Sequence, residues 1–245
     1  MTPQYLVPEW PAPACVRAVQ TTRHGGVSLA PYDTLNLGTH VGDDPLAVAA
    51  NRNRLQALVP GEPVWLDQVH GTAVVSAEAA ACLPVADACV TRRAGAVCAV
   101  MTADCLPVLL CDRHGRVVGA AHAGWRGLAD GVIEAAVAAM DTPPADLLAW
   151  LGPAIGPDAF EVGPEVREIF MRHAAEAAAA FVPREDKFLA SLDLLATQRL
   201  RALGITQIFG GGLCTYRDAG RFFSYRRDGR TGRMASLIWI APQGS

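Results

Sequence analysis

Short hydrophobic runs separated by polar turns follow one another along the chain and predict a mixture of strands and helices. The runs at 96–101 and 106–111 predict two buried strands, or one kinked strand, on either side of the polar stretch 102–105. The segment 112–115 is typical of a hairpin turn, and the strand that returns from it ends near His122. Further strands are expected at 64–66, 72–76, 86–91, 147–151, 208–213, 222–233 (where one leads into a polar hairpin) and 234–240.

Helices are expected where a capping residue precedes an apolar stripe. Asp44 followed by Pro45 begins the first of them. Its polar positions Asn51, Arg52 and Arg54 are expected to face solvent. Further helices are expected at 128–140, 164–181 and 191–204.

Length and composition fit one globular domain of mixed α/β class over residues 1–245. Hydrophobic residues make up 51% of the chain and charged residues 18%, which is the balance of a folded protein with a sizeable core. No internal repeat, low-complexity tract or linker divides the sequence. A single domain is therefore the simplest organisation.

Charge and cysteine usage exclude several classes of function. A formal net charge of −3 gives no electrostatic footprint for nucleic acid. No apolar run approaches the ~18 residues of a membrane-spanning helix, and the N-terminal residues lack the regions of a signal peptide. The seven cysteines are scattered without a CxxC pair, which indicates a reducing compartment and argues against a closed structural zinc site. We therefore expect a cytoplasmic protein that binds neither nucleic acid nor membrane.

Three side chains that can bind a metal lie at predicted junctions between strand and loop: His70, Cys105 and His122. Two imidazoles and one thiolate with an open fourth position are typical of catalytic zinc. Cys105 and His122 also fit a nucleophile and its base, and a lone cysteine in an apolar run is more often a small buried residue. Asp104, next to Cys105, places a carboxylate at the break of a buried strand and needs a partner there.

Six motifs carry a resemblance to a known family: TTRHGGVSLAPYDTLNLGTHVGDDP (21–45), DQVHG (67–71), TADCLPV (102–108), AAHAGWRGL (120–128), GPAIG (152–156) and SYRRDGRTGR (224–233). In these motifs, which extend over nearly the whole chain, the sequence resembles the laccase-domain family, also described as YfiH- or YlmD-type purine nucleoside phosphorylases. The resemblance implies a single-domain α+β fold. It implies two β-sheets packed together and flanked by helices in four layers (αββα), as in the catalytic domain of cytotoxic necrotizing factor toxins.

The resemblance also implies a chemistry. It implies one zinc ion held by His70, Cys105 and His122. It further implies phosphorolysis of adenosine, inosine, guanosine and methylthioadenosine to base and pentose 1-phosphate, together with adenosine deamination. Purine nucleosides and phosphate are then the partners of a monomer or homodimer. The older description, a multicopper polyphenol oxidase, fits poorly because such a centre needs roughly ten histidines and the chain has six.

Three residues are expected to take part in the reaction itself, and Asp87 is an alternative to one of them. Cys105 and His122 are predicted to be catalytic as well as metal-binding, and Asp104 is predicted to be catalytic beside them. Asp104 or Asp87 would orient a ligand or move a proton, because a buried-looking carboxylate close to such a site commonly does so.

Other polar residues are expected to meet the substrate. Arg23 and Arg226 are predicted to hold phosphate or ribose, and Tyr225 is predicted to stack on the purine. His24 and His40, in the loops near the N-terminus, are expected to line the pocket without binding the metal.

Two other functions use the same residues. A cysteine hydrolase would employ Cys105 as nucleophile and His122 as base, as the resemblance to the toxins suggests, and would act in the editing of peptidoglycan precursors. The second of these functions is that of a non-enzymatic protein that binds zinc or a nucleotide. Metal analysis combined with a Cys105→Ser variant separates these hypotheses, because a nucleophile mechanism requires no metal.

Overall fold

Two β-sheets carry the fold in the computed structural model, which describes residues 4–242. The first has the strand order β1-β2-β14-β6-β3, with bounds Tyr5–Leu6, Val16–Thr21, Met234–Ile240, Val97–Thr102 and Pro63–Val64. The second has the order β13-β9-β7-β8-β5-β4, with bounds Gln207–Gly210, Leu147–Leu151, Leu106–Asp112, Val118–Ala123, Ala88–Thr91 and Val74–Ser76. The central pairs are antiparallel, and parallel pairs occur at the edges, so both sheets are mixed.

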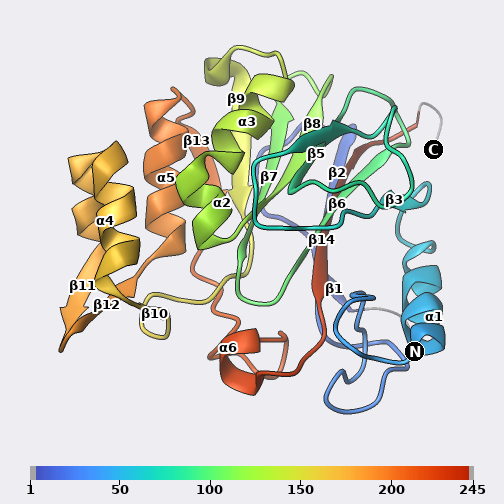
Figure 1. Ribbon diagram of the computed structural model, residues 1–245. Helices are drawn as coiled ribbons and strands as arrows, with labels where there is room; N and C mark the ends of the chain where they lie inside the picture. Colours follow the sequence, from blue (N-terminus) through green and yellow to red (C-terminus); the bar gives the residue numbers. More distant parts are fainter. Residues whose placement is uncertain (1–3, 243–245) are drawn as a thin grey trace.

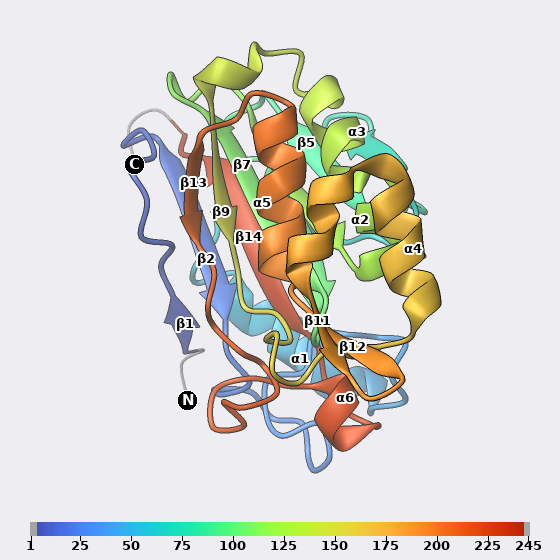
Figure 2. The same ribbon diagram turned by 90° about the vertical axis from the view of Figure 1, so that its left-hand side faces the viewer.

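The two sheets pack face to face, and helices cover their outer faces. Side chains of β6 such as Cys98 and Val100 meet side chains of β7 such as Leu109 and Cys111 in the core between the sheets. Helix α1 (Pro45–Leu55) covers the first sheet, and the helices that cover the second lie on the opposite side (Figures 1 and 2). These helices are α2 (Trp125–Asp130), α3 (Val132–Ala139) and α5 (Leu192–Ala202). The mixed α/β class and the αββα order of layers are therefore as predicted.

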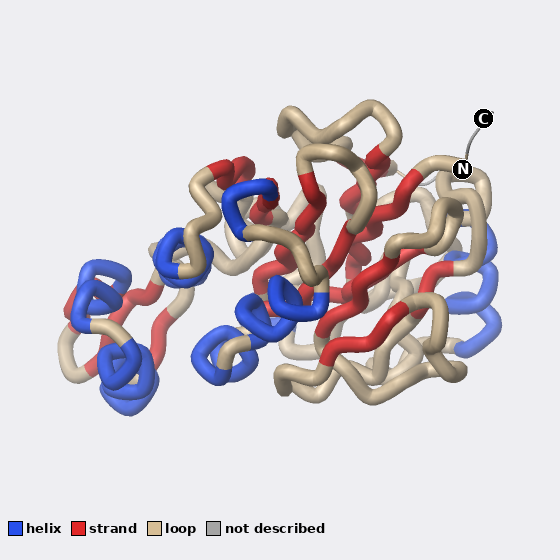
Figure 3. Tube along the Cα trace, turned by 90° about the horizontal axis from the view of Figure 1, so that it is seen from above, coloured by secondary structure: helices blue, strands red, loops and turns tan. Residues whose placement is uncertain are grey.

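A third, smaller sheet lies beyond this four-layer body. Its order is β10-β12-β11, with bounds Glu161–Val162, Lys187–Ala190 and Phe181–Arg184. Together with α4 (Pro164–His173) it forms a lateral extension outside α5, which is visible from above in Figure 3. The sequence pattern did not distinguish these short strands from the loops around them.

Two of the expected helices are interrupted. The helix expected at 128–140 is broken at Gly131, whose φ of 102° ends α2 and begins α3. The helix expected at 164–181 ends at His173, because Ala174 takes an extended conformation with φ −157°. A 3-10 segment at Ala175–Ala180 then leads into β11. The alanine content of this segment predicted one long helix, but helix propensity did not decide the structure at Ala174.

The segment 222–233 also differs from the expected strand and hairpin. It contains α6 (Tyr225–Asp228), and the Ser224 hydroxyl caps this helix by accepting a hydrogen bond from the Arg227 backbone N–H at 3.2 Å. A helix of this length has no periodic signal that a sequence pattern can reveal.

The polar side of α1 faces the loops of residues 22–43 and not solvent, contrary to the prediction. Asn51 is buried, and its amide accepts from the Val27 N–H and donates to the Ser28 hydroxyl, both at 2.8 Å. Arg52 donates to the Leu37 carbonyl at 3.0 Å. These side chains satisfy backbone and hydroxyl groups of an irregular loop that has no sheet to pair with. None of the helices within residues 4–242 is long and apolar enough to cross a membrane.

Candidate metal centre and its cavity

Three strand ends bring His70, Cys105 and His122 together. Cys105 directly precedes β7, and the pairing of Pro107 with His122 places the end of β8 beside it. His70 lies on the crossover from β3 in the first sheet to β4 in the second. The ligand atoms of the three residues all lie within 4.8 Å of one another, and Cys105 Sγ is 3.6 Å from His70 Nε2. The structure thus assembles the group predicted from the sequence.

Asp87 holds the His122 side chain and the His70 backbone from behind. Its carboxylate is fully buried and accepts hydrogen bonds from His122 Nδ1 at 2.8 Å and from the backbone N–H groups of His70 and Gly71 at 2.9 and 2.7 Å. Because Nδ1 of His122 is engaged, Nε2 is the nitrogen left for a metal, and a carboxylate behind a ligating histidine is the usual arrangement at metal centres. Burial by itself raises the pKa of Asp87, but these hydrogen bonds outweigh it and lower the pKa, so the group stays ionised.

The charges of Cys105 and His122 are coupled. Burial by itself raises the pKa of the Cys105 thiol, but the positive His122 ring and hydrogen bonds from both imidazoles bring that pKa to about 6. For His122, burial lowers the pKa, whereas the Cys105 thiolate and the Asp87 carboxylate raise it to about 9. At neutral pH the pair without a metal is therefore a thiolate and an imidazolium. A metal cation would take over the role of the imidazolium as the positive charge beside the sulfur.

Chelator-treated protein is expected to show this thiolate directly. Alkylation of Cys105 by iodoacetamide should rise with pH around a midpoint near 6, because the thiolate is the nucleophile and the imidazolium stabilises it. Peptide mass spectrometry at each pH measures the rate at this cysteine alone. In a His122→Gln variant the midpoint should move up towards the ordinary thiol value of about 8.5. A wild-type midpoint already near that value would contradict the ion pair.

Two glycines at the start of α2 allow the His70 loop to approach. A Cβ atom at Gly124 would lie 2.7 Å from His70 Cδ2 and 2.9 Å from Cys105 Sγ, and one at Gly127 would lie 2.9 Å from the Gly71 carbonyl oxygen. These glycines therefore set the distance between the helix and the metal-competent side chains.

A Gly124→Ala substitution is expected to lower metal affinity about 10- to 100-fold, because the added methyl group displaces two of the three candidate ligands. Zinc affinity measured by competition with a chromogenic chelator checks this. Gly220→Ala is the matched control, since its Cβ would meet nothing closer than 3.6 Å. Equal affinities for the two variants would show that the ligands can move aside without loss.

The metal-competent residues form one part of the wall of a cavity of about 350 Å³. Gln68, in this wall, donates to the Met101 carbonyl at 2.8 Å and accepts from the Met101 N–H at 2.7 Å, so it binds the His70 loop to the end of β6. The lining residues are His40, Gln68, His70, Met101, Thr102, Ala103, Cys105, His122, Tyr225 and Arg233. No aspartate or glutamate is among them, so no carboxylate in the wall would repel a ligand with negative charge.

Asp104 lies between two residues of the cavity wall but is not itself a lining residue. Its backbone has φ 100°, and its two carboxylate oxygens accept from the Thr215 hydroxyl and from the Arg226 backbone N–H, both at 2.6 Å. The carboxylate thus holds the first turn of α6, and with it Tyr225, whose side chain lines the cavity. Asp104 therefore positions the helix that carries Tyr225.

The structure does not bring Arg23 or Arg226 into the cavity wall. Arg23 donates from Nε to the Asp33 carbonyl at 2.9 Å and pairs through Nη2 with the Asp33 carboxylate at 3.2 Å. Arg226 donates to the Glu161 carbonyl at 3.0 Å. His24 contacts the Gly220 carbonyl and also lies outside the wall, whereas His40 lines the cavity as expected.

Sequence reasoning missed Arg233 as a cavity residue. It directly precedes β14, and the pairing of Met234 with Thr102 places it beside the end of β6 and the stretch that leads to Cys105. The register of the last strand against the first buried strand was the signal that could have identified it.

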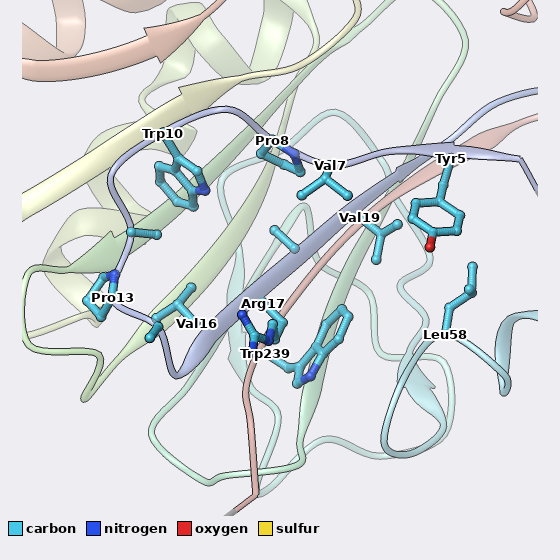
Figure 4. A pocket seen from close by; sticks show the side chains of 13 residues that line it. Tyr5, Val7, Pro8, Trp10, Pro13, Val16, Arg17, Val19, Leu58 and Trp239 are labelled. Carbon is cyan, nitrogen blue, oxygen red and sulfur yellow. The ribbon is translucent and has the colours of Figure 1, made fainter. Parts of the chain in front are cut away.

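A larger hollow of about 440 Å³ lies on the far side of the first sheet. Figure 4 shows the N-terminal segment with Val7, Pro8 and Trp10 arching over β2, and Trp239 of β14 beneath. Its lining is mostly apolar and contains no histidine, cysteine or carboxylate. The hollow therefore offers no group for the chemistry predicted from the sequence, and the cavity at His70, Cys105 and His122 is the candidate site.

Comparison with known proteins relates the chain to one family. The family described as multi-copper polyphenol oxidoreductase laccase matches residues 17–241. Two proteins named purine nucleoside phosphorylase, one from Pseudomonas aeruginosa and YfiH from Escherichia coli, are each 57% identical over 238 residues, covering 96% of this chain and 98% of the relative. Among solved structures, a Neisseria meningitidis protein superposes with a TM-score of 0.94 at 53% identity over 97% of this chain and 99% of its own. YlmD from Geobacillus stearothermophilus superposes with a TM-score of 0.86 at 31% identity over 94% of this chain and 93% of its own.

Proposed function

The chain belongs to the multi-copper polyphenol oxidoreductase laccase family, and from this membership we propose that it is a zinc-dependent purine nucleoside phosphorylase that also deaminates adenosine. The observation that carries the proposal is the group of His70, Cys105 and His122, held by Asp87 at the wall of a cavity. The relatives named purine nucleoside phosphorylase support the choice of substrate.

The donor set favours zinc over copper. One thiolate and two imidazoles with no fourth protein ligand form a typical catalytic zinc set. A multicopper oxidase needs several metal centres, whereas residues 4–242 contain one group of three histidine, cysteine or acidic residues that could hold a metal. When bound, zinc would supply Lewis acidity and an exchangeable coordination position.

The reaction proposed is displacement at the C1′ carbon of the nucleoside. A phosphate oxygen forms a bond to C1′, the C1′–N9 bond breaks, and its electron pair leaves with the purine. The proton of hydrogen phosphate ends on the purine nitrogen, so that adenosine and hydrogen phosphate give adenine and ribose 1-phosphate. In deamination, water instead replaces the amino group at C6, which leaves as ammonia.

Residues of the cavity can position these partners. Tyr225 is 60% exposed and belongs to the cavity wall, so its ring is available to stack on a purine. The Asp104 carboxylate fixes the helix that carries this ring. Asp87 keeps His122 in one tautomer and orientation throughout.

The cysteine-hydrolase alternative is less favoured. It uses Cys105 and His122 but gives His70 no role, although His70 Nε2 lies 3.6 Å from the cysteine sulfur. A metal centre uses all three residues, and the named relatives are phosphorylases.

The test is incubation of protein of known metal content with adenosine, with and without phosphate, and separate quantification of adenine, inosine, hypoxanthine and ribose 1-phosphate. The proposal expects adenine and ribose 1-phosphate only when phosphate is present, and inosine as the product when it is absent. With phosphate, inosine is cleaved further to hypoxanthine, so ribose 1-phosphate should equal the sum of adenine and hypoxanthine. Both activities should disappear on chelation and return with zinc. Turnover that survives complete removal of metal would favour the hydrolase.

A further inference from the structure

Arg233 lines the cavity and has an unused hydrogen-bonding edge. Its Nη1 donates to the carbonyl oxygens of Thr231 and Gly232, each at 3.1 Å, and these contacts fix the guanidinium. Nε and Nη2 have no hydrogen-bond partner among the described residues, and no carboxylate there forms an ion pair with Arg233. Since Nε and Nη2 lie on the same side of the guanidinium, they form the edge with which arginine binds oxyanions through two parallel bonds.

The same edge is already occupied in two other arginines, Arg23 and Arg227. In Arg23 it binds Asp33, with Nε on the carbonyl and Nη2 on the carboxylate. In Arg227 it binds Asp228, at 2.9 Å from Nε and 2.8 Å from Nη2. Arg233 differs from both because this edge has no hydrogen-bond partner and because the residue belongs to the cavity wall.

The Cys105 thiolate in the wall and the Asp104 carboxylate outside it attract the Arg233 charge, but neither is hydrogen-bonded to the guanidinium. Both polar ends of the Gln68 amide are bound to Met101. A metal dication would be balanced by the Cys105 thiolate and the Asp87 carboxylate, so the charge of Arg233 remains. A partly buried charge without a partner is unfavourable, and an anionic occupant would remove that cost.

The backbone around Arg233 is built to hold its side chain in this place. Its N–H donates to the Asn36 side chain at 2.9 Å, and its carbonyl accepts from Leu37 at 3.1 Å. Gly38 leaves room for the aliphatic stem, since a Cβ there would lie 2.8 Å from Arg233 Cγ. The guanidinium is therefore oriented before any ligand arrives, which lowers the entropic cost of binding.

We propose that the Nε–Nη2 edge of Arg233 is the subsite that binds inorganic phosphate, the co-substrate of the phosphorolysis proposed above, on which this inference rests. Arg233, and not Arg23 or Arg226, then carries the phosphate specificity. Deamination uses water in place of phosphate and does not need this edge.

The test is calorimetric titration of the zinc-loaded, full-length protein with inorganic phosphate. Arg233→Met and Arg233→Lys are both expected to weaken phosphate binding about 30- to 100-fold, because lysine keeps the charge but loses the paired donors. Zinc content should stay unchanged. Arg217→Met is the matched control, since Arg217 pairs with Asp158 outside the cavity wall. The phosphate KM of phosphorolysis should rise in parallel with the dissociation constant.

The outcomes separate this inference from the proposed function. If the wild type phosphorolyses nucleosides but the Arg233→Lys variant binds phosphate as tightly as the wild type, the subsite assignment is wrong. If phosphate binds in an Arg233-dependent way but the wild type releases no base, the subsite stands and the proposed function is wrong. A loss of phosphate binding in Arg217→Met equal to that in the Arg233 variants would overturn the assignment as well.

Discussion

A His70→Ala variant is expected to lose its metal and to lower both phosphorolysis and deamination of adenosine by about 10³-fold. The metal contributes several kcal/mol to the transition state, and two remaining donors, Cys105 and His122, do not hold it tightly. The substitution removes the His70 imidazole, whose Nε2 lies 3.6 Å from Cys105 Sγ. It should not unfold the chain, because His70 lies exposed on a crossover loop. Zinc per protein measured by mass spectrometry, together with product analysis, checks both parts.

His114→Ala is the matched control for this variant. His114 is exposed in the hairpin turn after β7 and does not line the cavity. It should retain metal and turnover at the wild-type level. Full nucleoside turnover by His70→Ala with metal still bound would show that the site has been assigned to the wrong residues.

An Asp87→Asn variant is expected to weaken zinc binding about 10- to 100-fold, which is the usual effect of removing the partner behind a metal ligand. The amide can accept through one atom only, while the carboxylate now serves His122 Nδ1 and the N–H groups of His70 and Gly71. An N–H group left unpaired in this buried place costs about 1–3 kcal/mol. The variant should therefore also unfold at a lower temperature. Competition titration and thermal denaturation with and without zinc measure the two effects.

Asp104→Asn is the informative comparison, because both residues are buried aspartates near the same cavity. Asp104 holds α6 through the Arg226 N–H and does not contact a candidate ligand. Its substitution should leave zinc affinity within about threefold of the wild type and should raise the KM for nucleosides. Equal losses of zinc affinity in the two variants would contradict the separate roles assigned to them.

The candidate metal centre could be predicted because each of its residues lies at a boundary that the sequence marks. Cys105 lies between two apolar runs, His122 lies at the end of the strand that returns from a turn, and His70 precedes a glycine. Strand pairing needs little more than these boundaries to bring Cys105 and His122 together. His70 arrives from a distant part of the chain, and the family resemblance indicated that it joins the other two residues.

The substrate side could not be predicted in the same way. Five arginines lie between residues 221 and 233, and the choice among them depends on α6, a helix too short for a periodic pattern. The direction of Asp104 depends on a backbone with positive φ, which non-glycine residues seldom adopt and a sequence does not reveal. Alternation of polar and apolar residues specifies which face of a strand is buried, but it does not specify irregular loops.

The origin of the three candidate ligands ties metal uptake to the folding of the chain. His70 belongs to the crossover between the sheets, whereas Cys105 and His122 belong to the second sheet, so their donor atoms converge only after the sheets have docked. An unfolded chain offers no comparable chelate, and the free energy of zinc binding then adds to the free energy of unfolding. Zinc at 100 times its dissociation constant would contribute about 2.7 kcal/mol in this way. The ion would thus act as a removable cross-link between the two halves of the core, and the persistence of the folded protein would follow the supply of zinc.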